Sequence, residues 1–280
     1  MKITVMSLFR DSDSYLNTTL KAFDSLTQMA QFDFEFLFYE NDSVDKTLFN
    51  LNQWMENKNG QIYSEKLGFP KFGSVPDLQR LVYLSYYRNR LLASSGDFNS
   101  EYTLLIDSDI EFEVNDLRKL YNAFDNDFVM LTANTREPRM SDMMFGKTRD
   151  CYYDVFALRD KYFNNGLYFT DCPLPLQEDR DAWEKGDVVE VGSAFGGFCL
   201  IKTDVLKQCK WSTCAHSEHV NFCSEVRRYG KIGIVPNCKP KAYADLSKVN
   251  LQVCQQIAQQ QIPFVQQVNN VFNTSQGVLT

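Results

Sequence analysis

The sequence has no stretch that approaches the ~20 consecutive apolar residues needed to span a bilayer, so we expect no transmembrane segment. The apolar run at the N-terminus, residues 2–9, is shorter than the core of a signal peptide, and Arg10 and Asp11 end it. Both absences predict a cytoplasmic protein.

Positive charge is also scarce. The chain has 29 Lys and Arg against 36 Asp and Glu, a formal net charge of -7, which argues against a nucleic-acid-binding protein. An acidic protein that binds an anionic ligand needs positive charge at the binding site, either from a bound cation or from a few well-placed arginines.

Ligands for zinc are few. There are two histidines, and none of the eight cysteines forms a C-x-x-C pair, so a structural zinc site is not expected. In the absence of a secretion signal we predict that the cysteines are free thiols, most of them buried.

What is present is an ordinary globular composition, 44% hydrophobic and 23% charged, over 280 residues. Apolar runs of strand length alternate with segments of helical periodicity, which predicts a single α/β domain with a sheet that is at least partly parallel and flanked by helices. Strands are predicted at residues 2–9, 34–39, 102–106, 128–133, 188–191, 196–202 and 232–235, and helices at 15–26, 48–55, 78–93, 116–124 and 218–229.

The remaining segments are polar. Residues 136–150 and 163–187 are predicted to be long loops. We place the domain at residues 1–250 and a C-terminal tail at 251–280. Residues 251–267 contain eight glutamines among apolar residues, a pattern that fits either a docked amphipathic helix or an unstructured tail.

The strongest candidate site is Asp107-Ser108-Asp109, directly after the predicted strand 102–106. Open α/β sheets bind ligands at the carboxyl ends of their strands. Carboxylate oxygens suit a hard divalent ion such as Mg²⁺ or Mn²⁺, which keeps open positions for phosphate oxygens. We therefore predict that Asp107 and Asp109 bind a metal ion. Glu111 and Glu113 continue the alternation and are predicted to be solvated.

A second polar cluster, with Glu40 and Asp42, follows the strand 34–39. Carboxylates at this place can accept hydrogen bonds from a ribose or from the imide of a base. The segment fits equally well a capping loop, in which Ser43 or Asp45 caps the next helix.

Arg88 and Arg90 lie on the predicted helix 78–93 and point in different directions, so at most one of them faces the site. The planar guanidinium of that arginine suits a phosphate group, and a surface salt bridge is the alternative.

Two later segments are also candidates. The pair Gly196-Gly197 precedes a strand, where glycines let the backbone approach a ligand closely or form a β-bulge. Glu218 and His219 open the last predicted helix. Either side chain could accept a proton from a hydroxyl group, and helix capping is the alternative role.

In this order, these segments resemble the GT-A class of glycosyltransferases. The set is similar to the fungal capsule-associated mannosyltransferase family over roughly residues 1–245. The compact length also resembles chlorella-virus enzymes that build capsid glycans, among them a xylosyltransferase. The segments that carry the resemblance are Tyr39–Ser43 with Thr47, Arg88-Asn89, Asp107–Asp109, Tyr153-Asp154 with Arg159-Asp160, Gly196-Gly197 and Ser217-Glu218.

The resemblance implies a Rossmann-like GT-A fold with a mixed, mostly parallel sheet, a donor half at about 1–135 and an acceptor half at about 136–250. It implies Mn²⁺ or Mg²⁺ on Asp109 and Asp107. A nucleotide-sugar donor would contact Phe9, Arg10, Glu40, Asp42, Arg88, Asp107, Ser108 and Asp109, and the acceptor would contact Asp154, Gly196 and Gly197.

Many enzymes of this class have an acidic pair where this chain has Glu218-His219, which implies Glu218 as the catalytic base with His219 orienting or substituting for it. They often add a late histidine as a metal ligand. Tyr243 and Asp245 stand there instead, so the remaining protein ligand is undefined.

The implied activity is transfer of a sugar from a UDP-sugar, with UDP-xylose favoured, to a hydroxyl of an oligosaccharide or glycoprotein, with inversion and, for a viral enzyme, in the host cytoplasm. A retaining GDP-mannose mannosyltransferase is the alternative. A sugar-nucleotide pyrophosphorylase is a second alternative, but its Gly-rich loop is missing near Phe9 and Arg10. A sugar-binding module would not need the two strand-end aspartates, and a glycosidase needs no nucleotide pocket.

Overall fold

The computed structural model describes residues 1–72, 77–96, 98–142, 147–168, 170–213 and 217–243. The chain forms two compact units. The larger contains residues 1–139 and 150–243. The smaller contains residues 140–149 and 244–280, of which the ends of two strands are described. The predicted tail at 251–280 lies outside the described residues.

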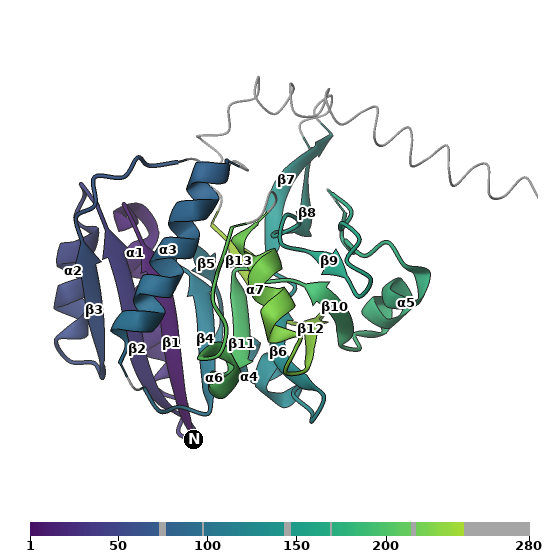
Figure 1. The fold of residues 1–280 in the computed structure, drawn as a ribbon, viewed down its shortest axis with the longest axis horizontal. Helices are drawn as coiled ribbons and strands as arrows, with labels where there is room; N and C mark the ends of the chain where they lie inside the picture. Colours follow the sequence, from purple (N-terminus) through teal and green to yellow (C-terminus); the bar gives the residue numbers. More distant parts are fainter. Residues whose placement is uncertain (73–76, 97, 143–146, 169, 214–216, 244–280) are drawn as a thin grey trace, which may run out of the picture. The chain divides into compact units, whose positions relative to one another are not determined.

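A nine-stranded mixed sheet forms the centre of the larger unit (Figure 1). On one side β3, β2, β1 and β4 are all parallel. Next comes β11, antiparallel to both of its neighbours, β4 and β6. The bounds, in sheet order, are β3 Gly60–Glu65, β2 Asp33–Asn41, β1 Lys2–Phe9, β4 Tyr102–Asp107, β11 Phe198–Lys202, β6 Phe128–Ala133, β12 Lys231–Val235, β10 Val189–Ser193 and β9 Arg159–Asp160.

A second sheet has the order β5-β13-β7-β8. Its strands are β5 Ile110–Glu111, β13 Lys241–Ala242, β7 Arg136–Asp142 and β8 Lys147–Tyr152. The sequence prediction of a loop over 136–150 is therefore wrong. The hydrophobic alternation that signals a strand is missing here, but backbone pairing on β13 stabilises β7 without it.

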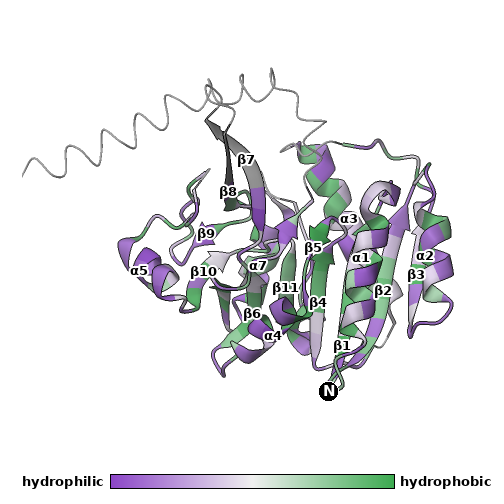
Figure 2. Cartoon of the chain, turned by 180° about the vertical axis from the view of Figure 1, so that it is seen from behind, coloured by the Kyte–Doolittle hydropathy of each residue, from purple (hydrophilic) through white to green (hydrophobic). Residues whose placement is uncertain are grey.

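Helices cover both faces of the large sheet. The cluster of buried side chains on one face includes those of α1, α2 and α4, and the cluster on the other face includes those of α3, α5, α6 and α7. In Figure 2 the central strands are coloured largely as hydrophobic, whereas the helices alternate between hydrophilic and hydrophobic residues. The bounds are α1 Asp13–Leu26, α2 Thr47–Met55, α3 Leu78–Ser94, α4 Val114–Asn122, α5 Gln177–Lys185, α6 Thr203–Leu206 and α7 Glu218–Val226.

Helix α5 lies in the segment 163–187, which the sequence predicts to be a loop, so this prediction is also wrong. The helix has acidic residues Glu178 and Asp179 in its first turn and ends at Gly186, whose φ is 82°. Negative charge at the start and a left-handed glycine at the end are helix signals that the high polarity of the segment conceals.

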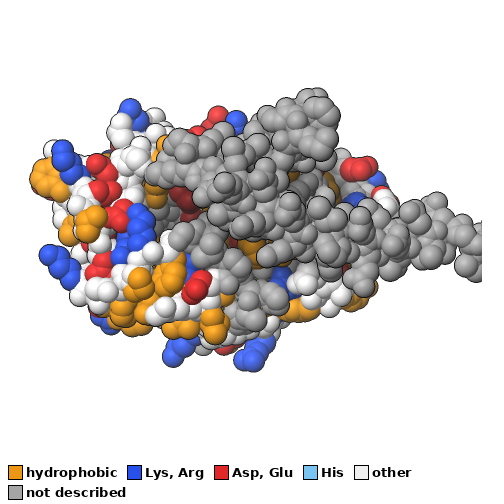
Figure 3. Space-filling view, turned by 90° about the horizontal axis from the view of Figure 1, so that it is seen from above, with side chains coloured by type: hydrophobic (Ala, Val, Ile, Leu, Met, Phe, Trp, Pro, Cys, Tyr) orange, Lys and Arg blue, Asp and Glu red, His pale blue; other side chains and the backbone are white. Residues whose placement is uncertain are grey.

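The other strand and helix predictions agree with the structure to within a few residues. The six described cysteines are free thiols, and all but Cys172 are buried, which confirms that prediction for the part of the chain described. None of the described helices is long and apolar enough to cross a membrane. On the face seen in Figure 3, basic, acidic and apolar side chains are interspersed.

Candidate active site

The carboxyl ends of three parallel strands meet at one edge of the sheet. In the register, Leu8 of β1 lies opposite Tyr39 of β2 on one side and opposite Asp107 of β4 on the other. The residues that follow each strand therefore lie next to each other. This places Arg10 and Asp107 at the same edge, where α/β sheets bind ligands.

A cavity of about 340 Å³ opens at this edge. Its lining comes from both halves of the chain. The lining residues are Leu8, Phe9, Arg10, Tyr15, Asn41, Pro70, Lys71, Phe72, Arg80, Leu81, Tyr83, Leu84, Tyr87, Arg88, Asp107, Ser108, Asp109, Glu137, Tyr153, Asp154, Phe156, Phe195, Ser217, Glu218 and His219.

The three residues Asp107, Ser108 and Asp109 are fixed from both sides. The Asp107 amide donates to the Gly197 carbonyl at 2.9 Å. The Thr19 hydroxyl donates to the Ser108 carbonyl at 2.8 Å. Burial, and then the charge of Asp107, raises the pKa of the Asp109 carboxyl to about 7. Burial also raises the pKa of Asp107. Two carboxylates that resist ionisation next to each other form a site that a cation would stabilise.

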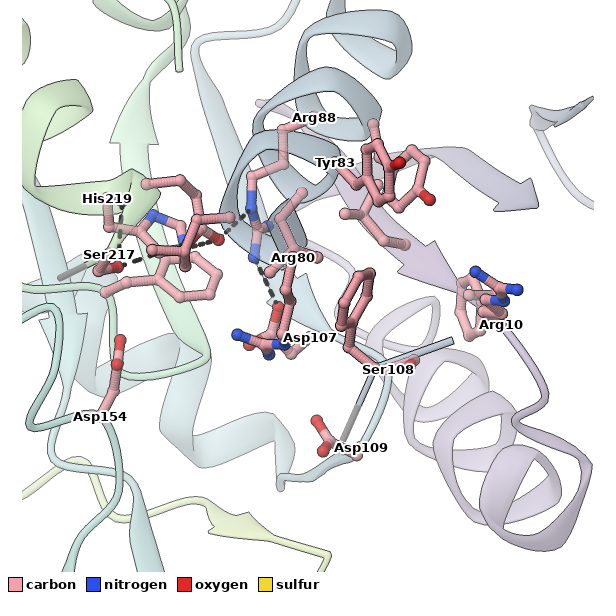
Figure 4. A pocket seen from close by; sticks show the side chains of 18 of the residues that line it. Arg10, Arg80, Tyr83, Arg88, Asp107, Ser108, Asp109, Asp154, Ser217 and His219 are labelled. Atoms are coloured by element: carbon pink, nitrogen blue, oxygen red, sulfur yellow. Dashed lines mark hydrogen bonds and ion pairs between the residues drawn. The ribbon is translucent and has the colours of Figure 1, made fainter. Parts of the chain in front are cut away.

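Arg88 connects this aspartate pair to the other side of the cavity (Figure 4). Its Nη2 donates to Asp107 Oδ1 at 3.1 Å, and its Nε donates to Glu218 Oε1 at 3.3 Å. The guanidinium carbon lies 4.8 Å from the ring centroid of Phe195. Arg90 pairs instead with Glu65, so of the two arginines only Arg88 lines the cavity.

Glu218 and His219 begin α7, where the Ser217 hydroxyl accepts a hydrogen bond from the His219 amide and caps the helix. The His219 ring stacks on Phe195 at 3.9 Å between centroids. Burial lowers the pKa of His219 to about 3, so the ring is neutral at physiological pH. Its Nδ1 accepts a hydrogen bond from the Trp211 indole at 3.4 Å, which puts the ring proton on Nε2.

Asp154 stands across the cavity from Asp107 and Asp109, on the side of Ser217 and His219 (Figure 4). Its oxygens accept two long hydrogen bonds, from the Ala157 amide at 3.4 Å and from the Gly196 amide at 3.3 Å. Burial, and then the charges of Asp107 and Glu218, raises the pKa of Asp154 to about 7.

Two of the predicted donor contacts, Glu40 and Asp42, do not line the cavity. Glu40 is buried and accepts hydrogen bonds from the Ser43 amide and the Ser64 hydroxyl. Asp42 accepts from the amides of residues 67–69 and so shapes the loop after β3, which contributes to the cavity wall. Both carboxylates are satisfied by the protein itself.

Gly196 and Gly197 also lie outside the lining. Both have φ near +65° and form the turn into β11. A Cβ at Gly196 would lie 2.5 Å from the Ala133 carbonyl oxygen, and one at Gly197 would lie 2.8 Å from Ile110 Cδ1. The close approach that requires glycine is therefore to the protein's own core.

The sequence prediction misses several lining residues on α3, above all Arg80 and Tyr83. Arg80 precedes Arg88 by eight residues, close to two helical turns, so both lie on the same face of α3. This spacing is a signal that could have identified Arg80 once Arg88 was placed at the site. Tyr15 on α1, whose hydroxyl lies 3.2 Å from Ser108 Oγ, had no comparable signal.

The carboxylate oxygens at this site suit a hard divalent cation as metal ligands. Asp107 and Asp109 offer carboxylate oxygens, which Mg²⁺ and Mn²⁺ prefer, and their raised pKa values reflect charge that a cation would neutralise. Within the described residues no group of three or more His, Cys, Asp or Glu side chains is arranged to hold a metal by itself.

Solved structures with the same arrangement of strands and helices identify the fold. S. aureus TarS, residues 1–349 in complex with UDP-GlcNAc, superposes with a TM-score of 0.53 at 15% identity, over 90% of this chain and 62% of that one. The chain has the GT-A fold. Glucosyl-3-phosphoglycerate synthase from Mycobacterium tuberculosis, with Mg²⁺ and UDP, superposes with a TM-score of 0.50 at 12% identity, over 93% of this chain and 78% of that one.

By sequence, the chain matches no protein-family model and no curated protein. It spans about three fifths of the TarS chain. The predicted GT-A fold is confirmed, and the narrower resemblance to fungal and viral enzymes stays a prediction.

Proposed function

We propose that this GT-A protein is a metal-dependent glycosyltransferase, which transfers a sugar from a nucleotide-sugar donor to a hydroxyl group of a glycan. The observation that carries the proposal is the pair Asp107 and Asp109 at the end of β4, facing a cavity that also contains Arg80 and Arg88. Both TarS and the mycobacterial synthase have structures with a bound uridine nucleotide, and the latter also with Mg²⁺.

The donor diphosphate is the part of the substrate that this lining suits best. Asp109 and Asp107 would hold Mn²⁺ or Mg²⁺, which neutralises the leaving diphosphate when bound. Arg80 lies on the same face of α3 as Arg88 and provides a second cation at the cavity. The donor half, about residues 1–135, would thus bind the nucleotide through its strand ends, and the acceptor half, about 136–250, would position the hydroxyl.

The donor and the stereochemistry follow from the family resemblance. We propose a UDP-sugar, with UDP-xylose as the first candidate, transferred with inversion to an oligosaccharide or glycoprotein. A retaining transfer from GDP-mannose is the other candidate that the resemblance supports. In an inverting reaction a carboxylate on the acceptor side has to take the hydroxyl proton. The acceptor half contributes three carboxylates to the cavity lining, Glu137, Asp154 and Glu218. The charge of Glu137 acts on Asp109, so Glu137 lies near the proposed metal ligands.

Two measurements test the proposal. Thermal unfolding with UDP, with GDP and with buffer, each with and without Mn²⁺, should show the largest stabilisation with UDP and Mn²⁺ together. A screen of UDP- and GDP-sugars should then show Mn²⁺-dependent release of the nucleotide from one donor. Full activity in EDTA would contradict the metal assignment, and tighter calorimetric binding of GDP than of UDP would contradict the donor assignment.

A further inference from the structure

Two of the carboxylates on the acceptor side, Glu218 and Asp154, differ in how many partners they have. Glu218 is engaged on every side: Oε1 lies 3.3 Å from Arg88 Nε and 3.3 Å from His219 Nε2, and Oε2 lies 3.5 Å from Ser217 Oγ. Its side chain is 5% exposed. A proton on Glu218 would therefore have to compete with a buried ion pair.

The charge around Glu218 also disfavours protonation. Burial alone would raise the pKa of the Glu218 carboxyl, but neighbouring positive charge holds it below its ordinary value. The groups that lower the pKa are His219 first, then Arg88, a backbone hydrogen bond and Arg80; of these, Arg88 donates a hydrogen bond directly to the carboxylate. A carboxylate with a lowered pKa is a weak proton acceptor.

Asp154 has the opposite surroundings. Its oxygens accept only the two long hydrogen bonds from backbone amides of residues 157 and 196, and no ion pair joins it to a cation in the described part of the chain. These amides fix the carboxylate at the wall of the cavity, and the turn that supplies one of them is itself fixed by Gly196.

We propose that Asp154, and not Glu218, takes the proton from the attacking hydroxyl group; this inference rests on the proposed function. As the hydroxyl oxygen forms its bond to the anomeric carbon, an Asp154 oxygen accepts the hydroxyl proton. The bond from the anomeric carbon to the diphosphate breaks, and its electron pair stays on the diphosphate oxygen. Glu218 is then a positioning residue, which holds Arg88 against Asp107.

The electrostatic setting of Asp154 fits this role. Its pKa, raised to about 7, lies close to physiological pH, where a general base is most effective. The titratable groups whose charges act on Asp154, or which respond to its charge, are Asp107, Glu218, Tyr152, Tyr153 and Cys223.

The test compares Asp154→Asn with Glu218→Gln in the full chain, using the nucleotide sugar that the wild-type protein hydrolyses, with water as acceptor. Water must also lose a proton when it attacks, so hydrolysis reports on the same step. We expect Asp154→Asn to lower kcat by about 10²–10⁴-fold with unchanged affinity for UDP and Mn²⁺. The pH dependence of kcat on the acid side should disappear in Asp154→Asn and persist in Glu218→Gln.

A second variant separates chemistry from folding. Azide is an anionic nucleophile that needs no base, so it should restore nucleotide release in Asp154→Ala and form a glycosyl azide. A near-native rate for Asp154→Asn, or no rescue of Asp154→Ala by azide, would overturn the inference. If the pH dependence of kcat on the acid side disappeared in Glu218→Gln and persisted in Asp154→Asn, Glu218 would be the proton acceptor. If the wild-type protein released nucleotide from no donor, the proposed function itself would fail.

Discussion

Replacing Arg88 by methionine tests the connection between the two sides of the cavity. The Arg88 side chain is 10% exposed and bridges Asp107 and Glu218. Methionine keeps much of the volume and the contact with Phe195, but it leaves both carboxylates without their cation. Removing one partner of a buried ion pair costs about 3–5 kcal/mol. Because the Asp107 side chain is 25% exposed and can recover some hydration, we take the lower limit, about 3 kcal/mol.

Arg90→Met is the matched control, since it changes the same residue type two positions along the same helix. The Arg90 side chain is 45% exposed, and its pair with Glu65 is at the surface, where ion pairs contribute little. Urea denaturation in EDTA at pH 8, followed by fluorescence, should show a marked shift of the midpoint for Arg88→Met and a small one for Arg90→Met.

The pH dependence gives a second, independent readout. Without Arg88, the native-state pKa values of Asp107 and Glu218 rise, so the native variant binds more protons than the unfolded chain and loses stability as the pH rises. The lowered pKa of Glu218 in the wild type contributes stability that is lost as the pH falls. The free energy of unfolding that Arg88→Met loses relative to the wild type should therefore be largest at pH 8 and smaller towards pH 5. If both arginine variants lost the same free energy of unfolding, or if the loss in Arg88→Met did not depend on pH, the proposed stabilisation by the Arg88 ion pairs with Asp107 and Glu218 would be refuted.

Three further predictions concern separate parts of the site. Asp109→Asn should abolish Mn²⁺-dependent donor hydrolysis. The raised pKa of Asp109 destabilises the fold increasingly between about pH 4 and 7, so in EDTA at pH 8 the variant should have a higher melting temperature than the wild type. A lower melting temperature would contradict this assignment. Gly196→Ala should lower the free energy of unfolding by about 1–3 kcal/mol, more than Gly68→Ala, because Gly68 shares the positive φ but has open space around it. Urea midpoints in the reverse order would be inconsistent with the clash at Ala133. Asp42→Ala removes the acceptor of three amides, so limited proteolysis should cut the loop after β3 faster, and unchanged cleavage would count against this role.

Most strands and helices were predictable because each carries a local signal. The apolar runs of β1, β2 and β4 and the helical spacing of α3 are visible in the sequence alone. The strand-end position of Asp107 followed from the same pattern. By contrast, β7 is stabilised by pairing with β13, more than 100 residues later, and such long-range pairing leaves no mark in the local sequence.

The roles of individual side chains were less predictable, because they depend on neighbours distant in sequence. Asp42 has a side chain suited to a ligand, but the amides of residues 67–69 satisfy it. Glu218 was chosen as the base from the resemblance, and only the folded chain shows that Arg88, 130 residues earlier, engages it. Asp154 stood in the resemblance motif, but its lack of a charged partner among the described residues is a property of the tertiary structure.

The antiparallel strand β11 has a consequence for the order of folding. In the large sheet it alone connects β1–β4 to the group of β6, β12, β10 and β9. During synthesis, β4 and β6 emerge well before residues 198–202, so each presents an open edge until β11 arrives. Closing the sheet then requires contacts between segments almost 100 residues apart, which slows folding. A nascent or truncated chain that ends before β11 therefore exposes one edge of β4 and both edges of β6, because β12, the other neighbour of β6, emerges later still.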